Sequence, residues 1–116
     1  MDYINVDGLA KAGPYVHAVA ADGMMFISGM IGEGLTVSEQ LISAFEKVDK
    51  VLSSKGMGRS NIVKVTVYLR ESRLFSEMNE EYSRLFPEKR PARTTIIAMP
   101  PVSDALLEVE VIASIR

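Results

Sequence analysis

The clearest hydrophobic pattern in the chain is helical and lies in its first half. Apolar residues recur three and four positions apart, as they do along one side of a helix; they are Leu41, Phe45, Val48 and Leu52, with Ile42 and Val51 widening the stripe. Thr36 and Glu39 precede this run with the spacing of a capping box, and Gly56 follows it as a common C-terminal signal. The pattern predicts a helix over about residues 38–54.

A second helical stripe occupies the segment before Pro87. Its apolar members again fall on one side of a helix; they are Leu74, Phe75, Met78, Tyr82, Leu85 and Phe86. Ser72 stands where a side chain could cap the first turn. Pro87 cannot continue a helix, because it lacks the N–H donor. A shorter second helix is therefore predicted between these two residues.

Strand patterns fill much of the remaining chain. Residues 62–70 alternate strictly between apolar and polar, with Val63, Val65, Val67 and Leu69 as the apolar members. Further strands are predicted at about residues 15–20, 24–28, 94–99 and 106–115, with a short hairpin connection at Ala21-Asp22-Gly23. The order β-β-α-β-α-β-β predicts one α+β domain over residues 1–116, with two helices packed on one face of a sheet.

Apolar residues are expected on both faces of this sheet. Met24–Ile27 is an unbroken apolar run, and Ile62, Thr66 and Tyr68 are expected to face away from the helices. Two helices can cover only one face, so the other face needs a second cover, for which another copy of the chain is the simplest candidate. A homo-oligomer is therefore predicted, against the alternative of an ordinary, partly exposed face.

Composition and charge narrow the class of function. The net charge is −2, with 13 basic and 15 acidic residues well mixed, and the absence of a basic stripe argues against nucleic-acid binding. The chain has no cysteine, which excludes disulfides, thiolate metal sites and cysteine nucleophiles and fits a reducing cytosol. Neither a signal-peptide pattern nor an apolar run of about 18–20 residues is visible, so a cytoplasmic protein without a membrane span is expected.

No metal or cofactor motif is visible in the sequence. His17 is the only histidine, which rules out a multi-histidine metal site, and it is interpreted as a structural residue of a strand. The glycines between Gly29 and Gly34 are not followed by the Lys-Ser/Thr pair of a phosphate loop. The residues therefore give no motif for a metal or a cofactor.

The last strand carries polar residues where its pattern is otherwise apolar. One face is apolar throughout, whereas the opposite face places Glu108 and Glu110 between Leu106 and Ile112. These carboxylates form either a solvated edge or, under a neighbouring subunit, a desolvated pair. In the second case at least one pKa rises, which suits that carboxylate to general acid–base chemistry.

Arg93 is also polar in an apolar setting, since it follows Pro91-Ala92 at the start of a predicted strand. A buried guanidinium needs an anion, and its planar fork suits a carboxylate. The partner is either the carboxylate of a ligand or a structural ion pair with Glu108 or Glu110. Periodicity does not separate these two interpretations.

Several short segments, in order and at similar spacing, resemble the RidA (YjgF) family over nearly the whole chain. They are Gly13-Pro14-Tyr15, Ile27-Ser28-Gly29, Asn61–Tyr68, Met78-Asn79 through Tyr82, Pro91-Ala92-Arg93-Thr94 and Leu107-Glu108-Val109-Glu110. The interval from Pro-x-Arg to Glu is the most specific part. The resemblance implies a chorismate-mutase-like α+β fold and a homotrimer with active sites in the clefts between subunits.

The resemblance also implies an activity. Members deaminate reactive enamines and imines, such as 2-aminoacrylate, by hydrolysis to 2-keto acids and ammonia, as 2-iminobutanoate/2-iminopropanoate deaminases do. Arg93 would hold the substrate carboxylate, and Glu108 would position and activate the attacking water. The cleft would further be lined by Tyr15, Ser28, Gly29 (through its backbone N–H), Asn79 and Thr95. No cofactor is required, because the imine carbon is already electrophilic.

The sequence departs from the family pattern near the implied cleft. Thr95 stands where many members have cysteine, Met30 replaces a common glutamine, and the connection from Met30 to the first helix is shorter. Two other functions stay open: a non-catalytic trimer that binds keto acids or regulates, and an RNA-directed relative of the translation-inhibitor or endoribonuclease type. The retained Glu108 argues against the first, and the absence of a basic groove argues against the second.

Overall fold

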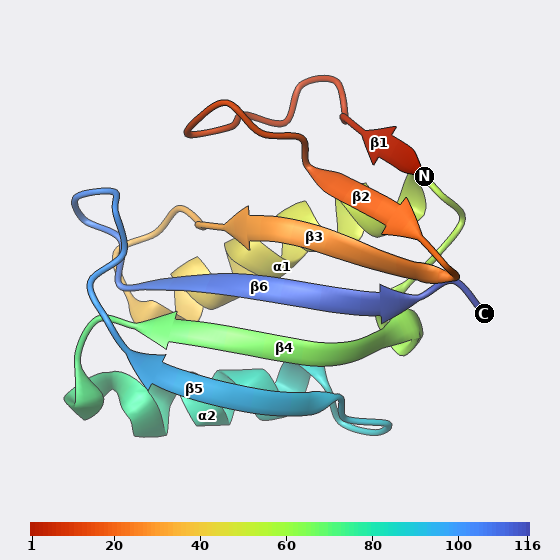
Figure 1. Cartoon of the computed structure of the whole chain (residues 1–116). Helices are drawn as coiled ribbons and strands as arrows, with labels where there is room; N and C mark the ends of the chain where they lie inside the picture. Colours follow the sequence, from red (N-terminus) through yellow and green to blue (C-terminus); the bar gives the residue numbers. More distant parts are fainter.

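Both predicted helices are present and pack on the same face of one sheet (Figure 1). The computed structural model describes all of residues 1–116, with α1 at Val37–Ser53 and α2 at Phe75–Leu85. The predicted capping box forms at α1: Thr36 Oγ1 accepts from the Glu39 N–H at 3.1 Å, and Glu39 Oε1 accepts from the Thr36 N–H at 3.2 Å. Each bond satisfies a backbone donor that the first turn would otherwise leave free.

The second helix begins differently from the prediction. Ser72 does not cap it; instead Ser72–Leu74 forms a short 3₁₀ turn that leads into α2 without a side-chain cap. The Leu74 N–H donates to the Glu71 carbonyl within this turn, so a backbone group takes the role that the Ser72 hydroxyl was expected to play.

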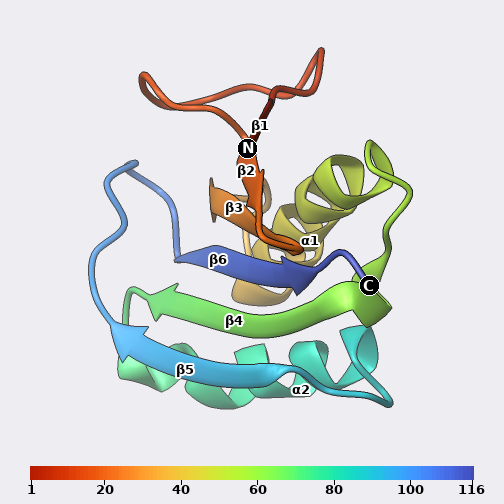
Figure 2. The same cartoon turned by 45° about the vertical axis from the view of Figure 1, so that its right-hand side comes forward.

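The sheet has six strands in the order β1-β2-β3-β6-β4-β5. Their bounds are Asp2–Ile4 for β1, Ala18–Ala21 for β2, Met24–Met30 for β3, Ile62–Leu69 for β4, Ala92–Ile97 for β5 and Leu107–Ser114 for β6. Only β4 and β5 run parallel, and α2 makes the crossover between them. In Figure 2 the strands lie one beside the other, with β5 at the edge farthest from the N-terminus.

The first strands show what the pattern could and could not predict. The hairpin between β2 and β3 is confirmed, with positive φ angles of 54° at Asp22 and 76° at Gly23, as a two-residue turn of the favoured hand requires. β2 begins only at Ala18, because the Tyr15 N–H bonds to the Gly13 carbonyl in a tight turn. Strand β1 was not predicted, since three residues are too few to show an alternation.

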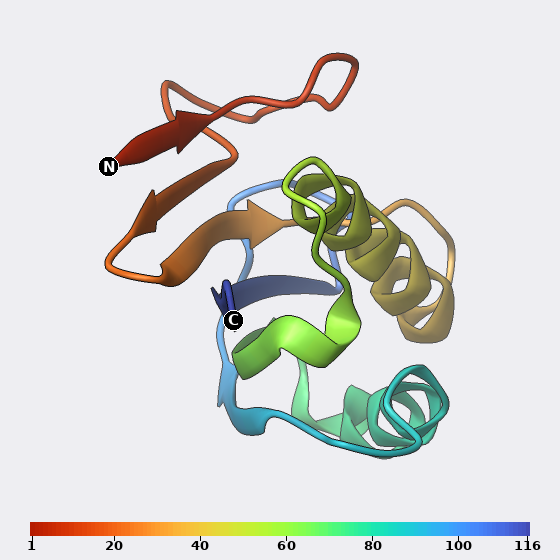
Figure 3. The same cartoon turned by 90° about the vertical axis from the view of Figure 1, so that its right-hand side faces the viewer.

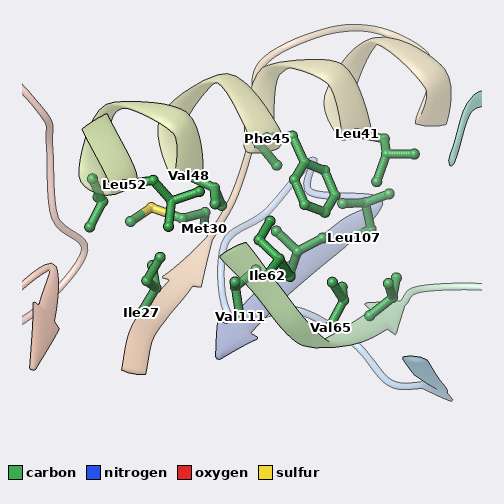
Figure 4. Packing of buried hydrophobic residues seen from close by; sticks show 14 of the residues in the cluster. Ile27, Met30, Leu41, Phe45, Val48, Leu52, Ile62, Val65, Leu107 and Val111 are labelled. Atoms are coloured by element: carbon green, nitrogen blue, oxygen red, sulfur yellow. The ribbon is translucent and has the colours of Figure 1, made fainter. Parts of the chain in front are cut away.

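The core lies between the helices and the inner face of the sheet. Figure 4 shows Leu41, Phe45, Val48 and Leu52 of α1 above Val65 and Leu107 of the sheet. All of these side chains are fully buried, and each contributes about 1.5–3 kcal/mol relative to exposure. The core therefore fixes the register of β6, because a slip of one residue would turn its carboxylates inward.

One predicted orientation is wrong. Ile62 was expected on the face away from the helices, but it is only 5% exposed and belongs to the core. The pairing of β4 with β6 shifts register between Ile62 and Lys64, and this irregularity turns Ile62 inward and leaves Val63 outward. Thr66 and Tyr68 do lie on the face opposite the core, as predicted.

The other face of the sheet is open in the single chain, and Figure 3 shows both helices on the opposite side. Neighbouring strands place an apolar row across this open face; in order of pairing it consists of Tyr3, Val19, Phe26 and Ile112. Phe26 is 48% exposed, whereas its neighbours Met25 and Ile27 are buried in the core. The unbroken apolar run in β3 therefore contributes side chains both to the core and to the open face.

No helix is long and apolar enough to span a bilayer.

Candidate active site

Glu108 lies on the open face of β6, between core residues that point the other way. Its side chain is half-buried and its carboxylate makes no hydrogen bond within the chain. Burial raises the pKa of Glu108 above the ordinary value, and the nearby charge of Glu110 raises it further. A partly desolvated carboxylate with free lone pairs is suited to accept a proton from water.

Gly29 makes room for this carboxylate. A Cβ at position 29 would lie 2.2 Å from Glu108 Oε2, a distance that no side chain could keep. The pairing of β3 with β6 is irregular between Ile27 and Met30, so the strand bulges where Glu108 lies against it. Glycine at such a bulge permits a close approach to backbone.

A cavity of about 810 Å³ opens beside Glu108. Four of the predicted site residues line it: Tyr15, Ser28, Gly29 and Glu108. Ser28 Oγ donates to the Val16 carbonyl at 2.8 Å, and Tyr15 Oη accepts from the Ala12 N–H at 3.0 Å. Both hydroxyl groups are thus held in fixed positions at the wall of the cavity.

Arg93 lies elsewhere, on the helix-covered side of the edge strand β5. Its Nη2 donates to Asn79 Oδ1 at 2.7 Å, and its guanidinium carbon is 4.7 Å from the centroid of the Tyr82 ring and 5.8 Å from that of Phe75. These contacts order the guanidinium without neutralising it.

The predicted alternative of a structural ion pair does not form within the chain. None of the four salt bridges includes Arg93, and Glu110 accepts instead from the Tyr68 hydroxyl at 2.8 Å. The only other polar contact of the guanidinium is a long one, 3.9 Å from Arg93 Nη1 to the Met78 sulfur. The guanidinium is therefore left with unused donors.

The hydroxyl group of Thr95 lies near Arg93 and makes no hydrogen bond. Both residues line a second hollow, together with Ser72, Phe75 and Ile97. Thr95 Oγ1 and Tyr82 Oη are buried without a hydrogen-bond partner, and an unsatisfied buried group costs about 1–3 kcal/mol. Burial also raises the pKa of Tyr82 to about 12, which keeps its hydroxyl protonated. A polar ligand near Arg93 would find both a charge and a hydroxyl group.

The predicted site residues thus form two groups that a single chain does not bring together. Tyr15, Ser28, Gly29 and Glu108 line the first cavity, whereas Asn79, Arg93 and Thr95 gather at the second hollow. Strand β4 separates β6 from β5, and the two groups lie on opposite faces of the sheet. One chain therefore carries the predicted site residues in two separate clusters.

Sequence reasoning missed some residues that contribute to the site. Phe75 and Tyr82 were assigned to an apolar helix stripe, yet both rings contact the Arg93 guanidinium; no sequence signal distinguishes these roles. Met30, expected at the cleft rim, does line the first cavity, and the rest of its side chain is buried in the core (Figure 4). His17 was expected to be a satisfied structural histidine. It is buried and its Nδ1 accepts from the Val6 N–H at 2.9 Å, but its Nε2 is buried without a hydrogen-bond partner.

Comparisons with known proteins show the family to which the chain belongs. The family model described as "Endoribonuclease L-PSP" matches residues 6–115. A RutC family protein of Aquifex aeolicus is 39% identical over 112 residues, which is 87% of this chain and 88% of that protein. The crystal structure of the YjgF gene product of E. coli superimposes with a TM-score of 0.90 over 100% of both chains, at 27% identity. The chain belongs to the RidA (YjgF) family.

Other relatives in the RidA family carry more specific names. An Arabidopsis thaliana protein named "Reactive Intermediate Deaminase A, chloroplastic" is 35% identical over 116 residues, covering 91% of this chain and 61% of that one. The crystal structure of yeast Mmf1 has a TM-score of 0.87 at 28% identity and covers 99% of this chain and 100% of that one. The predicted α+β fold, with two helices on one face of the sheet, is confirmed as the RidA-family fold.

Proposed function

We propose that this chain hydrolyses reactive enamines and imines derived from 2-amino acids, such as 2-aminoacrylate, to 2-keto acids and ammonia. The observation that carries the proposal is the Glu108 carboxylate, which is half-buried, free of hydrogen bonds, raised in pKa and open to a large cavity. A relative named as a reactive intermediate deaminase supports the same chemistry.

The reaction needs a base, an anion-binding group and a water molecule. Arg93 holds the substrate carboxylate, and the Thr95 hydroxyl donates a further hydrogen bond to it. Glu108 accepts a proton from water as the water oxygen bonds to the imine carbon. The resulting carbinolamine receives that proton on nitrogen, so its amino group leaves as ammonia. The hydroxyl group then gives its proton to the Glu108 carboxylate, which leaves the carbonyl of the 2-keto acid. Binding and orienting the substrate and the water account for the rest of the rate enhancement, because free imines already hydrolyse in water.

A complete site on this proposal needs two subunits. Arg93 and Thr95 lie on the edge strand β5, where a neighbouring chain can reach them, and Asn79 of α2 is hydrogen-bonded to Arg93. The open face of the sheet supports such an assembly, because its exposed apolar row needs a cover. In a closed trimer each chain gives its Arg93 half-site to one neighbour and its Glu108 half-site to the other.

The chain is expected to be a homotrimer in solution at micromolar concentration. Light scattering or native mass spectrometry measures this directly, since the single chain has a mass of 12.8 kDa. Phe26→Asp places a charge in the exposed apolar row and is expected to shift the population toward monomer. A stable wild-type monomer would contradict the proposed inter-subunit site.

The pH dependence of turnover is expected to report on the carboxylate pair. The base must be ionised, so kcat/KM should fall as pH drops through the raised pKa of Glu108. Glu110→Gln removes one cause of the raised pKa, and the acid limb should then move to lower pH. A pH–rate profile of both proteins tests this expectation, and a limb that moves to higher pH would refute it.

The activity itself is tested by generating the imino acid in place. An amino-acid oxidase or a threonine or serine dehydratase supplies the imine, and its disappearance is followed with and without this protein. A rate increase supports the hydrolase; saturable binding of 2-ketobutyrate without any increase supports a non-catalytic ligand-binding trimer.

A ribonuclease function is the other candidate, because the matching family model is described as "Endoribonuclease L-PSP". The large cavity is lined by the carboxylates of Glu33, Asp104, Glu108 and Glu110. Of its two lysines, Lys47 is already paired with Glu33 at 3.0 Å. A phosphate backbone would meet mainly negative charge there, which favours the imine hydrolase.

A further inference from the structure

Gln40 is a buried polar residue on α1 whose side-chain amide is hydrogen-bonded at both its nitrogen and its oxygen. It is only 4% exposed. Its Nε2 donates to the Gly34 carbonyl and to the Asp104 carbonyl, each at 3.0 Å, and its Oε1 accepts from the Leu106 N–H at 2.7 Å. Buried hydrogen bonds to backbone groups on separate segments fix those segments relative to one another.

The partners of Gln40 belong to the two segments that wall the Glu108 cavity. One segment, residues 31–36, joins β3 to α1, and the other, residues 98–106, joins β5 to β6. Together they supply nine of the twenty residues that line the cavity. Figure 1 shows both connections at the same end of the sheet, beside the start of β6.

Each of the two segments contacts the rest of the chain separately, but only Gln40 is hydrogen-bonded to both. In the segment between β3 and α1, a Cβ at Gly32 would lie 2.1 Å from the Gln40 carbonyl oxygen, so this segment lies directly on the α1 backbone. In the second, Arg70 Nε donates to the Ala105 carbonyl at 2.7 Å. Asp104 adopts a left-handed φ of 71°, and its carbonyl is the one that Gln40 holds.

The third hydrogen bond links Gln40 to the base. Leu106 lies two residues before Glu108, and the bond from its N–H to Gln40 Oε1 fixes the chain where β6 begins. We propose that Gln40 is a positioning residue, which holds the two walls of the cavity and the start of β6 so that Glu108 faces the bound imine. This inference rests on the proposed function.

The test compares Gln40→Met, which keeps the volume but loses all three bonds, with Gln40→Asn, whose amide is too short to bridge both segments. Gln40→Met is expected to assemble and to lose about 10–100-fold in kcat, as a displaced catalytic group does. KM should change little, because Arg93 and its neighbours are untouched. Gln40→Asn should show an intermediate loss, and it decides the matter where Gln40→Met does not fold.

Asn61→Ala is the matched control. Asn61 also bridges two backbone groups, since its Nδ2 donates to the Ser114 carbonyl at 2.9 Å and its Oδ1 accepts from the Gly58 N–H at 3.0 Å, but it does so at the far end of β6. This variant is expected to lower Tm and leave kcat unchanged. A Gln40 variant that likewise loses only Tm would overturn the positioning role while the hydrolase stands.

Amide hydrogen exchange separates this inference from the proposed function. In Gln40→Met, residues 31–35 and 102–106 are expected to exchange faster together, while the core of α1 stays protected. If the wild-type protein hydrolyses no imine, the proposed function fails. Amide hydrogen exchange in Gln40→Met then tests by itself whether Gln40 links the two segments. Unchanged exchange in both segments would then refute the link as well.

Discussion

Replacing Glu108 by glutamine is expected to leave a folded, assembled protein that turns over imino acids about 10²–10⁴ times more slowly. The amide keeps the shape of the side chain against Gly29 but cannot accept a proton from water. The measurement is kcat on imine generated in place, with circular dichroism and native mass spectrometry to show that fold and assembly persist.

The thermal stability of Glu108→Gln is expected to stay the same or to rise, although its turnover falls. Burial and the Glu110 charge raise the folded-state pKa of Glu108, so its ionised form is less favourable in the folded chain than in the unfolded one. This destabilisation is present at neutral pH and disappears as pH falls below the unfolded-state pKa. Glu108→Gln should therefore keep or raise Tm at neutral pH.

Glu110→Gln serves as the control for Glu108. Its carboxylate is on the same face but is more exposed and already bonded to Tyr68. We expect a small loss of kcat at the pH optimum. Equal losses from both substitutions would assign the base function to the pair or to neither carboxylate.

Arg93→Ala is expected to weaken binding of pyruvate or 2-ketobutyrate by about 10–150-fold, because a hydrogen bond to a charged group contributes about 1.5–3 kcal/mol. Its partner within the chain is the neutral Asn79, so removal leaves no unpaired buried charge. Loss of the contacts with Tyr82 and Phe75 should lower the free energy of unfolding by only about 0.5–2 kcal/mol. Calorimetric titration and thermal unfolding measure the two effects.

Two further variants make the Arg93 result specific. Arg93→Lys should restore affinity only partly, since an ammonium lacks the planar fork. Arg59 is a matched arginine away from the cavity, paired with Asp49 and 5.9 Å from the Phe45 ring, and Arg59→Ala should lower Tm without changing affinity. If Arg93→Ala instead loses about 3–5 kcal/mol of stability and the wild-type protein binds no keto acid, the role of Arg93 is structural.

The elements with strong periodicity could be predicted from the sequence. Helix α1, the Asp22-Gly23 turn and the alternation of β6 follow from local rules of spacing and capping. The inward turn of Ile62 could not be predicted, because it depends on a register shift against β6, which is a property of two distant strands. The short strand β1 exists only through its pairing with β2.

The candidate site was predictable to a similar degree. Glu108 and Arg93 stand out because they interrupt apolar strands, and the structure gives each a place consistent with its proposed role. Their separation within one chain was not readable from residue spacing, since strand order decides it. Gln40 gave no signal either, because it occupies an ordinary position in a helix and its partners are up to 66 residues away.

The placement of Glu108 and Arg93 on opposite faces of the sheet has a consequence for mixed assemblies. On the proposed trimer, a Glu108→Gln chain still offers an intact Arg93 half-site, and an Arg93→Ala chain still offers an intact Glu108. Neither variant alone can form a working cleft, yet random co-assembly of equal amounts would pair the two intact halves in about a quarter of the clefts. Two inactive proteins, unfolded and refolded together, should thus complement one another, and a cell with one damaged and one normal copy would keep activity in proportion to the pairings that remain whole.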